Sequence, residues 1–132
     1  MANLSDSSIQ ELLSKPYYAV VSTHGENGSI HNAVVWQDAD ADTLYLNSAI
    51  GRVWPSNLER DPNVTVTVIN GENPYEYVTV TGKADSTTDG ADEHIDKLAK
   101  KYLDADSYPF RQEGEERIIY RVTPDKVRYV KQ

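Results

Sequence analysis

The chain has 132 residues, a length that fits one domain with a hydrophobic core of its own, and we expect residues 1–132 to form a single domain. It contains no cysteine, which excludes disulfide bonds, thiolate metal sites and cysteine nucleophiles. The formal charge of −8 disfavours nucleic-acid binding, and no apolar run is long enough for a signal peptide or a membrane span, so we expect a cytoplasmic protein without membrane contacts.

The first half of the sequence alternates apolar and polar residues in short runs, which is typical of antiparallel strands. A short helix is expected first, capped near Ser5 or Asp6 and ended by Pro16. The strands expected next cover residues 17–23, 30–37 and 43–47, with turns at residues 25–28 and 38–42. A second short helix is expected to end near Asp61 and Pro62.

The second half continues the alternation and adds one longer helix, which Asp89 is expected to cap. The apolar residues of this helix recur at helical spacing and are Ala91, Ile95, Leu98, Ala99, Tyr102 and Leu103. Further strands are expected at residues 64–69, 75–83, 117–122 and 126–130. Six or seven strands without a strand–helix–strand rhythm predict a mainly β protein, a β-barrel with peripheral helices.

No segment carries a strong catalytic signature. The glycines at residues 25–28 lack the spacing of a phosphate-binding loop and are expected to form a turn. His24, His31 and His94 have no further ligand at suitable spacing, so no metal site is expected. Because His94 lies beside lysines on the longer helix, it is expected to face solvent. The nine tyrosines are mostly expected to pack on half-buried strand faces.

The segment from Asn47 to Asn57 is the most informative for function. It follows a strand, contains the isolated base Arg52 and leads into a short helix. Backbone N–H groups at a helix start, together with an arginine, form a natural anion-binding site. An ordinary strand-to-helix connection with a solvated arginine fits the same residues equally well, so both interpretations stay open at this point.

The same segment resembles a known family. The run from Gly51 to Val64, GRVWPSNLERDPNV, is similar to a signature of the pyridoxamine-phosphate-oxidase-like split-barrel superfamily. Later motifs follow in an order similar to the branch of deazaflavin-dependent oxidoreductases that use coenzyme F-420. These motifs are Lys101-Tyr102-Leu103, Tyr108-Pro109, Glu116-Arg117 and residues 122–127. Residues 19–23 and 32–36 also fit, so the resemblance covers nearly the whole chain.

This resemblance implies a six-stranded split β-barrel of the FMN-binding type, a homodimer, and a cofactor in a groove between the subunits. It implies that Arg52 binds the cofactor phosphate and that Asn57 matches a family position at the helix. It also places the ring system of the cofactor near residues of the second and third strands, which are Asn32, Val34, Ser48, Ala49 and Ile50.

Trp54 departs from the family pattern, because members commonly have a lysine two residues after the arginine. Ser56 likewise stands where a further base is common. Each charge-assisted hydrogen bond contributes about 1.5–3 kcal/mol, so cofactor binding is expected to be weaker unless another base compensates. Lys83 or a base of the partner subunit is a candidate for this role.

We therefore expect a deazaflavin-dependent reductase that transfers a hydride from coenzyme F-420 to a small conjugated substrate. The cofactor carries the hydride, so the protein supplies binding, orientation and exclusion of water. One alternative is an oxidoreductase of the same superfamily that binds FMN or FAD. The other is a barrel that carries a ligand without catalysing a reaction, which the tryptophan at position 54 favours.

Overall fold

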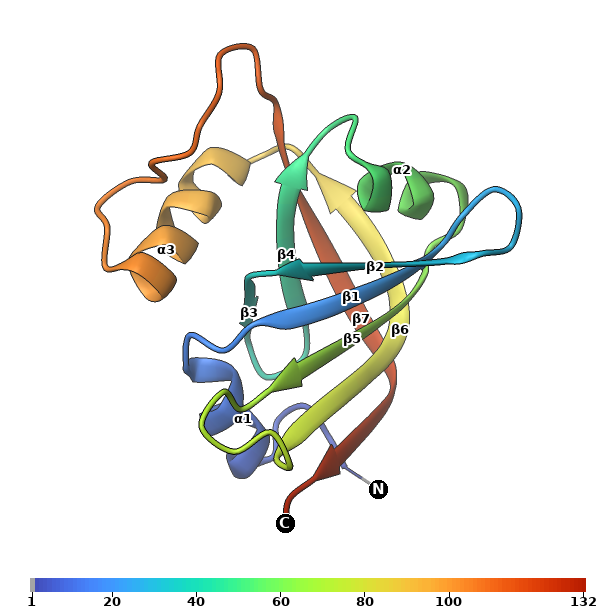
Figure 1. Ribbon diagram of the computed structural model, residues 1–132, viewed down its shortest axis with the longest axis vertical. Helices are drawn as coiled ribbons and strands as arrows, with labels where there is room; N and C mark the ends of the chain where they lie inside the picture. The colour runs from blue at the N-terminus through green and yellow to red at the C-terminus, as the bar shows by residue number, and fades with distance from the viewer. Residues whose placement is uncertain (1) are drawn as a thin grey trace.

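The computed structural model describes residues 2–132, which form one curled antiparallel sheet with three helices around it (Figure 1). The seven strands are hydrogen-bonded in the order β2-β1-β5-β6-β7-β4-β3. Their bounds are β1 Ala19–His24, β2 Ile30–Val35, β3 Gln37–Ala39, β4 Leu44–Ala49, β5 Asn63–Ile69, β6 Tyr77–Thr87 and β7 Arg117–Val130. The helices are α1 Ser7–Ser14, α2 Val53–Arg60 and α3 Ala91–Leu103. The predicted mainly β fold is confirmed, with seven strands in place of the six that the resemblance implied.

The chain turns a corner at Trp36 that the alternation pattern does not reveal. The pattern predicts one strand over residues 30–37, but the structure contains two strands, β2 and β3, on either side of this residue. β2 pairs with β1 at one end of the sheet, whereas β3 pairs with β4 at the other end. The Trp36 ring stacks on Tyr102 with centroids 5.1 Å apart, and the Gln37 N–H donates to the Tyr102 hydroxyl. These contacts fix the corner, which curls the sheet into a split barrel.

The last strand is continuous where two strands were expected. β7 runs through Thr123 and Pro124, residues whose composition predicts a turn. Its register with β6 shifts between Thr81 and Gly82, which marks a β-bulge. A Cβ on Gly82 would lie 2.1 Å from the Thr123 carbonyl oxygen, so only glycine permits this close approach. The bulge therefore accommodates the proline without ending the strand.

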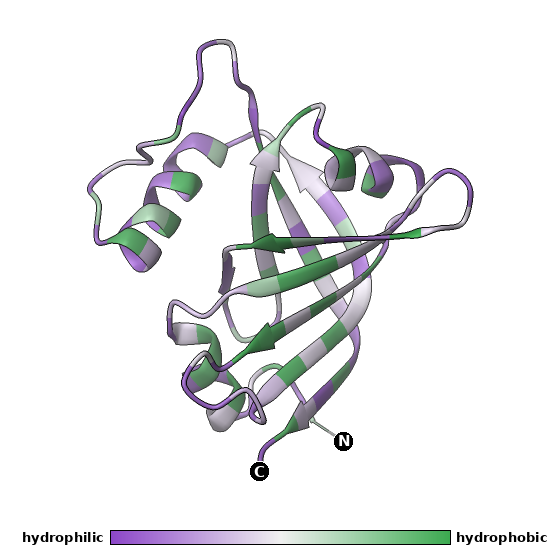
Figure 2. Ribbon diagram, viewed as in Figure 1, coloured by the Kyte–Doolittle hydropathy of each residue, from purple (hydrophilic) through white to green (hydrophobic). Residues whose placement is uncertain are grey.

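The core lies inside the curl and follows the alternation of the strands. On β5, Val64, Val66 and Val68 are buried, while the threonines between them face outward. Figure 2 shows this alternation of hydrophobic and hydrophilic residues along the strands. Ile9 and Leu12 of α1 complete the core at one end of the barrel, and Trp54 and Leu58 of α2 pack against it as well.

Helix α3 packs on β4 and β7 and buries most of the predicted face. Its buried residues are Ala91, Ile95, Leu98 and Ala99, whereas Leu103 is largely exposed. Asp89 does not cap the helix, because the N-cap is Gly90 in a left-handed conformation. None of the helices formed by residues 2–132 is long and apolar enough to cross a membrane.

Lys101 joins the end of α3 to two other elements. Its Nζ donates to the carbonyl oxygens of Leu13 in α1 and Gln37 in β3, at 2.7 and 2.8 Å. Burial lowers the pKa of the Lys101 amine to about 8, although the Asp38 carboxylate acts in the opposite direction. The charged amine therefore destabilises the folded state at neutral pH relative to an ordinary lysine.

The stability of the wild type relative to Lys101→Met is expected to rise with pH. An unfolded lysine has a pKa of about 10.4, so between about pH 8 and 10 the unfolded chain binds more protons than the folded one. With allowance for partial solvent screening, the gain from pH 7 to pH 9 is on the order of 1 kcal/mol. Urea unfolding of both proteins at the two pH values measures it. If the difference in unfolding free energy between the two proteins does not vary with pH, the pKa of the Lys101 amine is not lowered by burial.

Candidate functional site

A cavity of about 380 Å³ lies where the two ends of the sheet meet α3. Its walls come from β2 and the Trp36 corner, from β4 and the start of α2, and from α3 with the segment that follows it. Most of its lining is apolar, with a few polar side chains among them, which is typical of small-molecule sites. The cavity therefore bridges strands that are far apart in the hydrogen-bonded order of the sheet.

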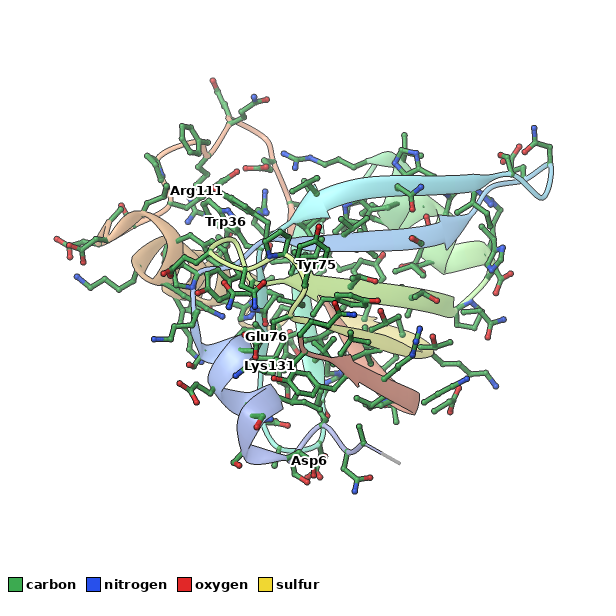
Figure 3. All side chains as sticks on the ribbon, turned by 60° about the horizontal axis from the view of Figure 1, so that its bottom comes forward. Asp6, Trp36, Tyr75, Glu76, Arg111 and Lys131 are labelled. Atoms are coloured by element: carbon green, nitrogen blue, oxygen red, sulfur yellow. The ribbon has the colours of Figure 1, made fainter. Side chains whose placement is uncertain are left out.

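Aromatic side chains form one wall of this cavity. Trp36 meets Tyr108 edge-on with centroids 6.0 Å apart, and Tyr108 meets Phe110 in the same way at 5.7 Å. Tyr18 and Phe110 also line the cavity and remain largely exposed to solvent. Figure 3 shows Trp36 close to the segment that carries Arg111, after α3. Rings arranged in this way suit a planar ligand, because flat apolar groups stack on them favourably.

Two arginines of the cavity share one carboxylate. Arg117 Nη1 donates to Glu115 Oε1 at 2.6 Å, and Arg52 Nη2 contacts the same oxygen at 3.3 Å. Burial by itself would raise the pKa of the Glu115 carboxyl. The Gln112 N–H and the Arg117 guanidinium outweigh this effect and hold that pKa below its usual value. The Arg52 side chain is 52% exposed and lines both the cavity and the neighbouring depression.

Asn47 connects the floor of the cavity to α3. Its Nδ2 donates to the Ala91 carbonyl and to His94 Nδ1, both at 3.0 Å, and its Oδ1 accepts from Arg117 Nε at 3.0 Å. The expectation that His94 faces solvent is wrong, because the ring is 11% exposed and lies 3.7 Å from the Asp38 carboxylate. Within residues 2–132, no three or more His, Asp or Glu side chains are grouped to hold a metal ion.

Asp38 of β3 faces α3 beside this network. Burial by itself would raise the pKa of the Asp38 carboxyl group. The contacts with His94 and with Lys97 Nζ, at 3.0 Å, outweigh burial and hold the pKa well below its usual range. Asp38 is therefore ionised at neutral pH, and it anchors α3 against the sheet.

Ser48 contributes a hydroxyl group to the cavity wall. The residue is 1% exposed, and its Oγ has no hydrogen-bond partner among the described residues. A buried hydroxyl without a partner is unfavourable by about 1–3 kcal/mol. A ligand with a polar atom in the cavity would remove this penalty by bonding to the Ser48 hydroxyl.

The structure brings together half of the site residues expected from the resemblance. Val34, Ser48, Arg52 and Trp54 line the cavity. Ala49 and Ile50 lie instead in a neighbouring depression formed with Arg52 and residues 112–116. The other two residues lie elsewhere, since the Asn32 side chain bonds to Ser22 on the outer face of β1 and β2, and Asn57 is buried against Thr23.

Trp54 belongs to the core as much as to the cavity. It is 6% exposed, and its ring lies 5.4 Å from that of Tyr120. The Tyr120 hydroxyl in turn contacts the Pro55 carbonyl and Glu59, which holds α2 on the sheet. The position that matches a basic residue in the family is therefore a packing position in this chain.

Several lining residues are not expected from the sequence. Trp36, Tyr108, Phe110 and Arg117 are not among the expected site residues, although the resemblance includes residues 32–36, Tyr108-Pro109 and Glu116-Arg117. The pair Tyr108-Phe110, two aromatic residues in a polar segment, is the one local signal that points to a site. Arg117 gives no such signal, because an arginine at the start of a strand is usually exposed.

The curled sheet, with a cavity between its ends, defines a split-barrel protein. A sequence profile described as pyridoxamine 5'-phosphate oxidase matches residues 5–131, and the chain belongs to this family. No curated protein matches the chain.

Solved structures share the fold over most of their length. An F-420 reductase is 25% identical, with a TM-score of 0.79 over 90% of this chain and 94% of the other. General Stress Protein 26 from Bacillus anthracis is 21% identical, with a TM-score of 0.70 over 91% and 88% of the two chains. HupZ from Group A Streptococcus is 16% identical, with a TM-score of 0.70 over 94% and 92%. The last two similarities show the fold alone.

Proposed function

We propose that this protein binds coenzyme F-420 in the cavity and uses it to reduce a small conjugated substrate. The observation that carries the proposal is the buried Ser48 hydroxyl, which lacks a partner among the described residues and lies in a cavity lined by aromatic rings and Arg52. The structural similarity to an F-420 reductase supports a deazaflavin. FMN is the second candidate, because the family as a whole includes proteins that bind flavin-type cofactors.

Different residues of the cavity would contact different parts of such a cofactor. When bound, the deazaflavin supplies the hydride chemistry. Arg52 binds its phosphate with the guanidinium donors of its half-exposed side chain. Ser48 donates a hydrogen bond to a polar edge of the ring system, and Trp36 and Tyr108 exclude water from its apolar side.

We also propose that two copies of the chain form a dimer over this groove. Val34, Ile50 and Val53 are 70%, 51% and 58% exposed, and they lie on β2 and around the start of α2. Exposed apolar residues that gather in this way are typical of surfaces covered by a partner. Light scattering is expected to give twice the chain mass of 14.8 kDa, whereas a monomer at micromolar concentration would contradict the proposed groove.

Titration of the purified protein with F-420, followed by deazaflavin fluorescence, tests the proposed function. Binding is expected in the submicromolar range, roughly −8 kcal/mol or stronger. A yellow protein that retains FMN or FAD would favour the second candidate. If the protein binds none of F-420, FMN and FAD, the proposal of a redox enzyme is wrong. The remaining alternative is then a barrel that carries a ligand without catalysing a reaction.

Arg52→Ala is expected to weaken F-420 binding by about 1.5–3 kcal/mol, because a charge-assisted hydrogen bond to the phosphate is lost. The thermal stability is expected to change little, since the Arg52 side chain is half exposed. Arg121→Ala is the matched control, because Arg121 is also a half-exposed arginine with one carboxylate partner, Asp85. If Arg52→Ala and Arg121→Ala bind F-420 with equal affinity, Arg52 is a solvated surface residue that does not contact the cofactor.

A further inference from the structure

Two arginines that line the cavity converge on one oxygen atom of the protein itself. Arg52 stands at the N-cap of α2 and Arg117 at the start of β7, and both contact Glu115 Oε1. Convergent guanidinium donors are a common way for proteins to bind an anion. In this chain the carboxylate of Glu115 already occupies the place between them.

The carboxylate is held firmly in front of Arg52. The Glu115 side chain is 6% exposed, and its other oxygen, Oε2, accepts the Gln112 N–H at 3.2 Å. Arg117 is 2% exposed at its side chain and is fixed further by Asn47 and by the ring of Tyr108, 5.0 Å away. The pair of Glu115 and Arg117 is therefore fixed by several contacts, with Arg117 in the cavity wall and Glu115 in the neighbouring depression.

Arg52 is the exposed partner in this arrangement. It is half exposed, and among the described residues Glu115 is its one side-chain partner, at the long distance of 3.3 Å. An incoming anion can therefore take Arg52 from Glu115 without disturbing the shorter contact between Glu115 and Arg117. The negative charge of Glu115 stays beside the site and opposes the bound anion.

We propose that Glu115 competes with the ligand for Arg52. It lowers the affinity of the site for anions, because a bound anion must displace the carboxylate from Arg52 while the negative charge of Glu115 stays nearby. This inference rests on the proposed function, since it concerns the phosphate end of the same site.

Calorimetric titration with inorganic pyrophosphate tests the inference independently of the ring system. Glu115→Gln keeps an acceptor oxygen for Arg117 and removes the charge, so pyrophosphate binding is expected to become about three- to tenfold tighter. Glu116→Gln is the matched control, because it removes the same charge from the neighbouring exposed residue. Its effect is expected to be less than about twofold, since solvent screens the exposed charge. The gain from Glu115→Gln is expected to disappear when Arg52→Ala is present.

Several outcomes would overturn the inference. These are equal gains from the two glutamine variants, a gain that persists without Arg52, and weaker or absent pyrophosphate binding by Glu115→Gln. Shifts of Tm with pyrophosphate give the same comparison if this variant is only marginally stable.

The same variants separate this inference from the proposed function. If pyrophosphate binds as expected but F-420 does not bind, the proposed function fails and the inference stands. If F-420 binds through Arg52 while the two glutamine variants behave alike, the inference fails and the proposed function stands.

Discussion

Replacing Arg117 by methionine is expected to lower the free energy of unfolding by about 3–5 kcal/mol, because it leaves a buried carboxylate without its main partner. The guanidinium contacts Glu115 at 2.6 Å and Asn47 at 3.0 Å, and it lies over the ring of Tyr108. Methionine has a similar length but donates no hydrogen bond, so both oxygen atoms lose a donor inside the protein. Urea unfolding followed by tryptophan fluorescence measures the change.

Arg121→Met is the matched control on the same strand. Arg121 pairs with Asp85, but the two side chains are 45% and 70% exposed, so a change of about 0–1 kcal/mol is expected. Equal losses in the two variants at pH 7 would contradict the buried-pair explanation.

Acid provides a second test of the same explanation. The folded-state pKa of Glu115 lies below its usual value, so the ionised carboxylate stabilises the fold above an ordinary carboxyl pKa of about 4.3. This contribution is lost as the pH falls through the lowered pKa. The penalty of Arg117→Met is therefore expected to shrink below about pH 4.

Trp54→Lys has the second large expected effect, a loss of about 3–5 kcal/mol in stability together with weaker F-420 binding. Trp54 is almost fully buried against Tyr120, so lysine leaves a void and places an ammonium group in the core. The weakening is not expected to vary with salt, since it arises from lost packing rather than lost attraction. Unfolding curves and F-420 titrations at two salt concentrations measure both effects.

Ser56→Lys separates packing from charge in this helix. It adds the same charge two residues later, at an exposed side chain outside the proposed dimer surface. Its stability is expected to stay within about 0.5 kcal/mol of the wild type, and any gain in phosphate binding is expected to be about 0.2–1 kcal/mol. Tighter, salt-sensitive F-420 binding by Trp54→Lys would instead support the hypothesis that this tryptophan replaces a phosphate-binding lysine.

Alternation along the chain predicts that strands exist, but it does not show where a strand bends or continues. The run from Ala33 to Trp36 is apolar throughout and is typical of one continuous strand, so nothing in it marks the corner at Trp36. Thr123 and Pro124 have the composition of a turn, yet the bulge opposite Gly82 keeps them within β7. The corner depends on Tyr102 of α3 and the bulge on Gly82 of β6, and both partners are distant in the sequence.

The residues of the candidate site likewise fall into those that the sequence predicts and those that it does not. Ser48 and Arg52 lie in one continuous segment with a recognisable motif, so the resemblance includes them and the cavity contains them. Arg117 and Tyr108 enter the cavity from the far end of the chain. Their motifs indicate the family, but no local pattern marks either residue as part of a site. His94 is buried because Asn47, which lies 47 residues earlier, bonds to its ring. Local composition predicts a lysine-rich exposed helix at that point, and the long-range contact decides otherwise.

The corner at Trp36 gives a bound ligand a mechanical role. β2 and β3 end the sheet on opposite sides, and in the described part of the chain no ladder of hydrogen bonds joins them. A ligand in the cavity would touch β2 on one side and β4 on the other. It would therefore hold together the two ends of the sheet, which are not joined by a ladder of hydrogen bonds among the described residues. Transient opening of the barrel at this split would then require the ligand to leave first. The amide protons of β2 and β3 should accordingly be the ones whose exchange with solvent slows most when the cavity is filled.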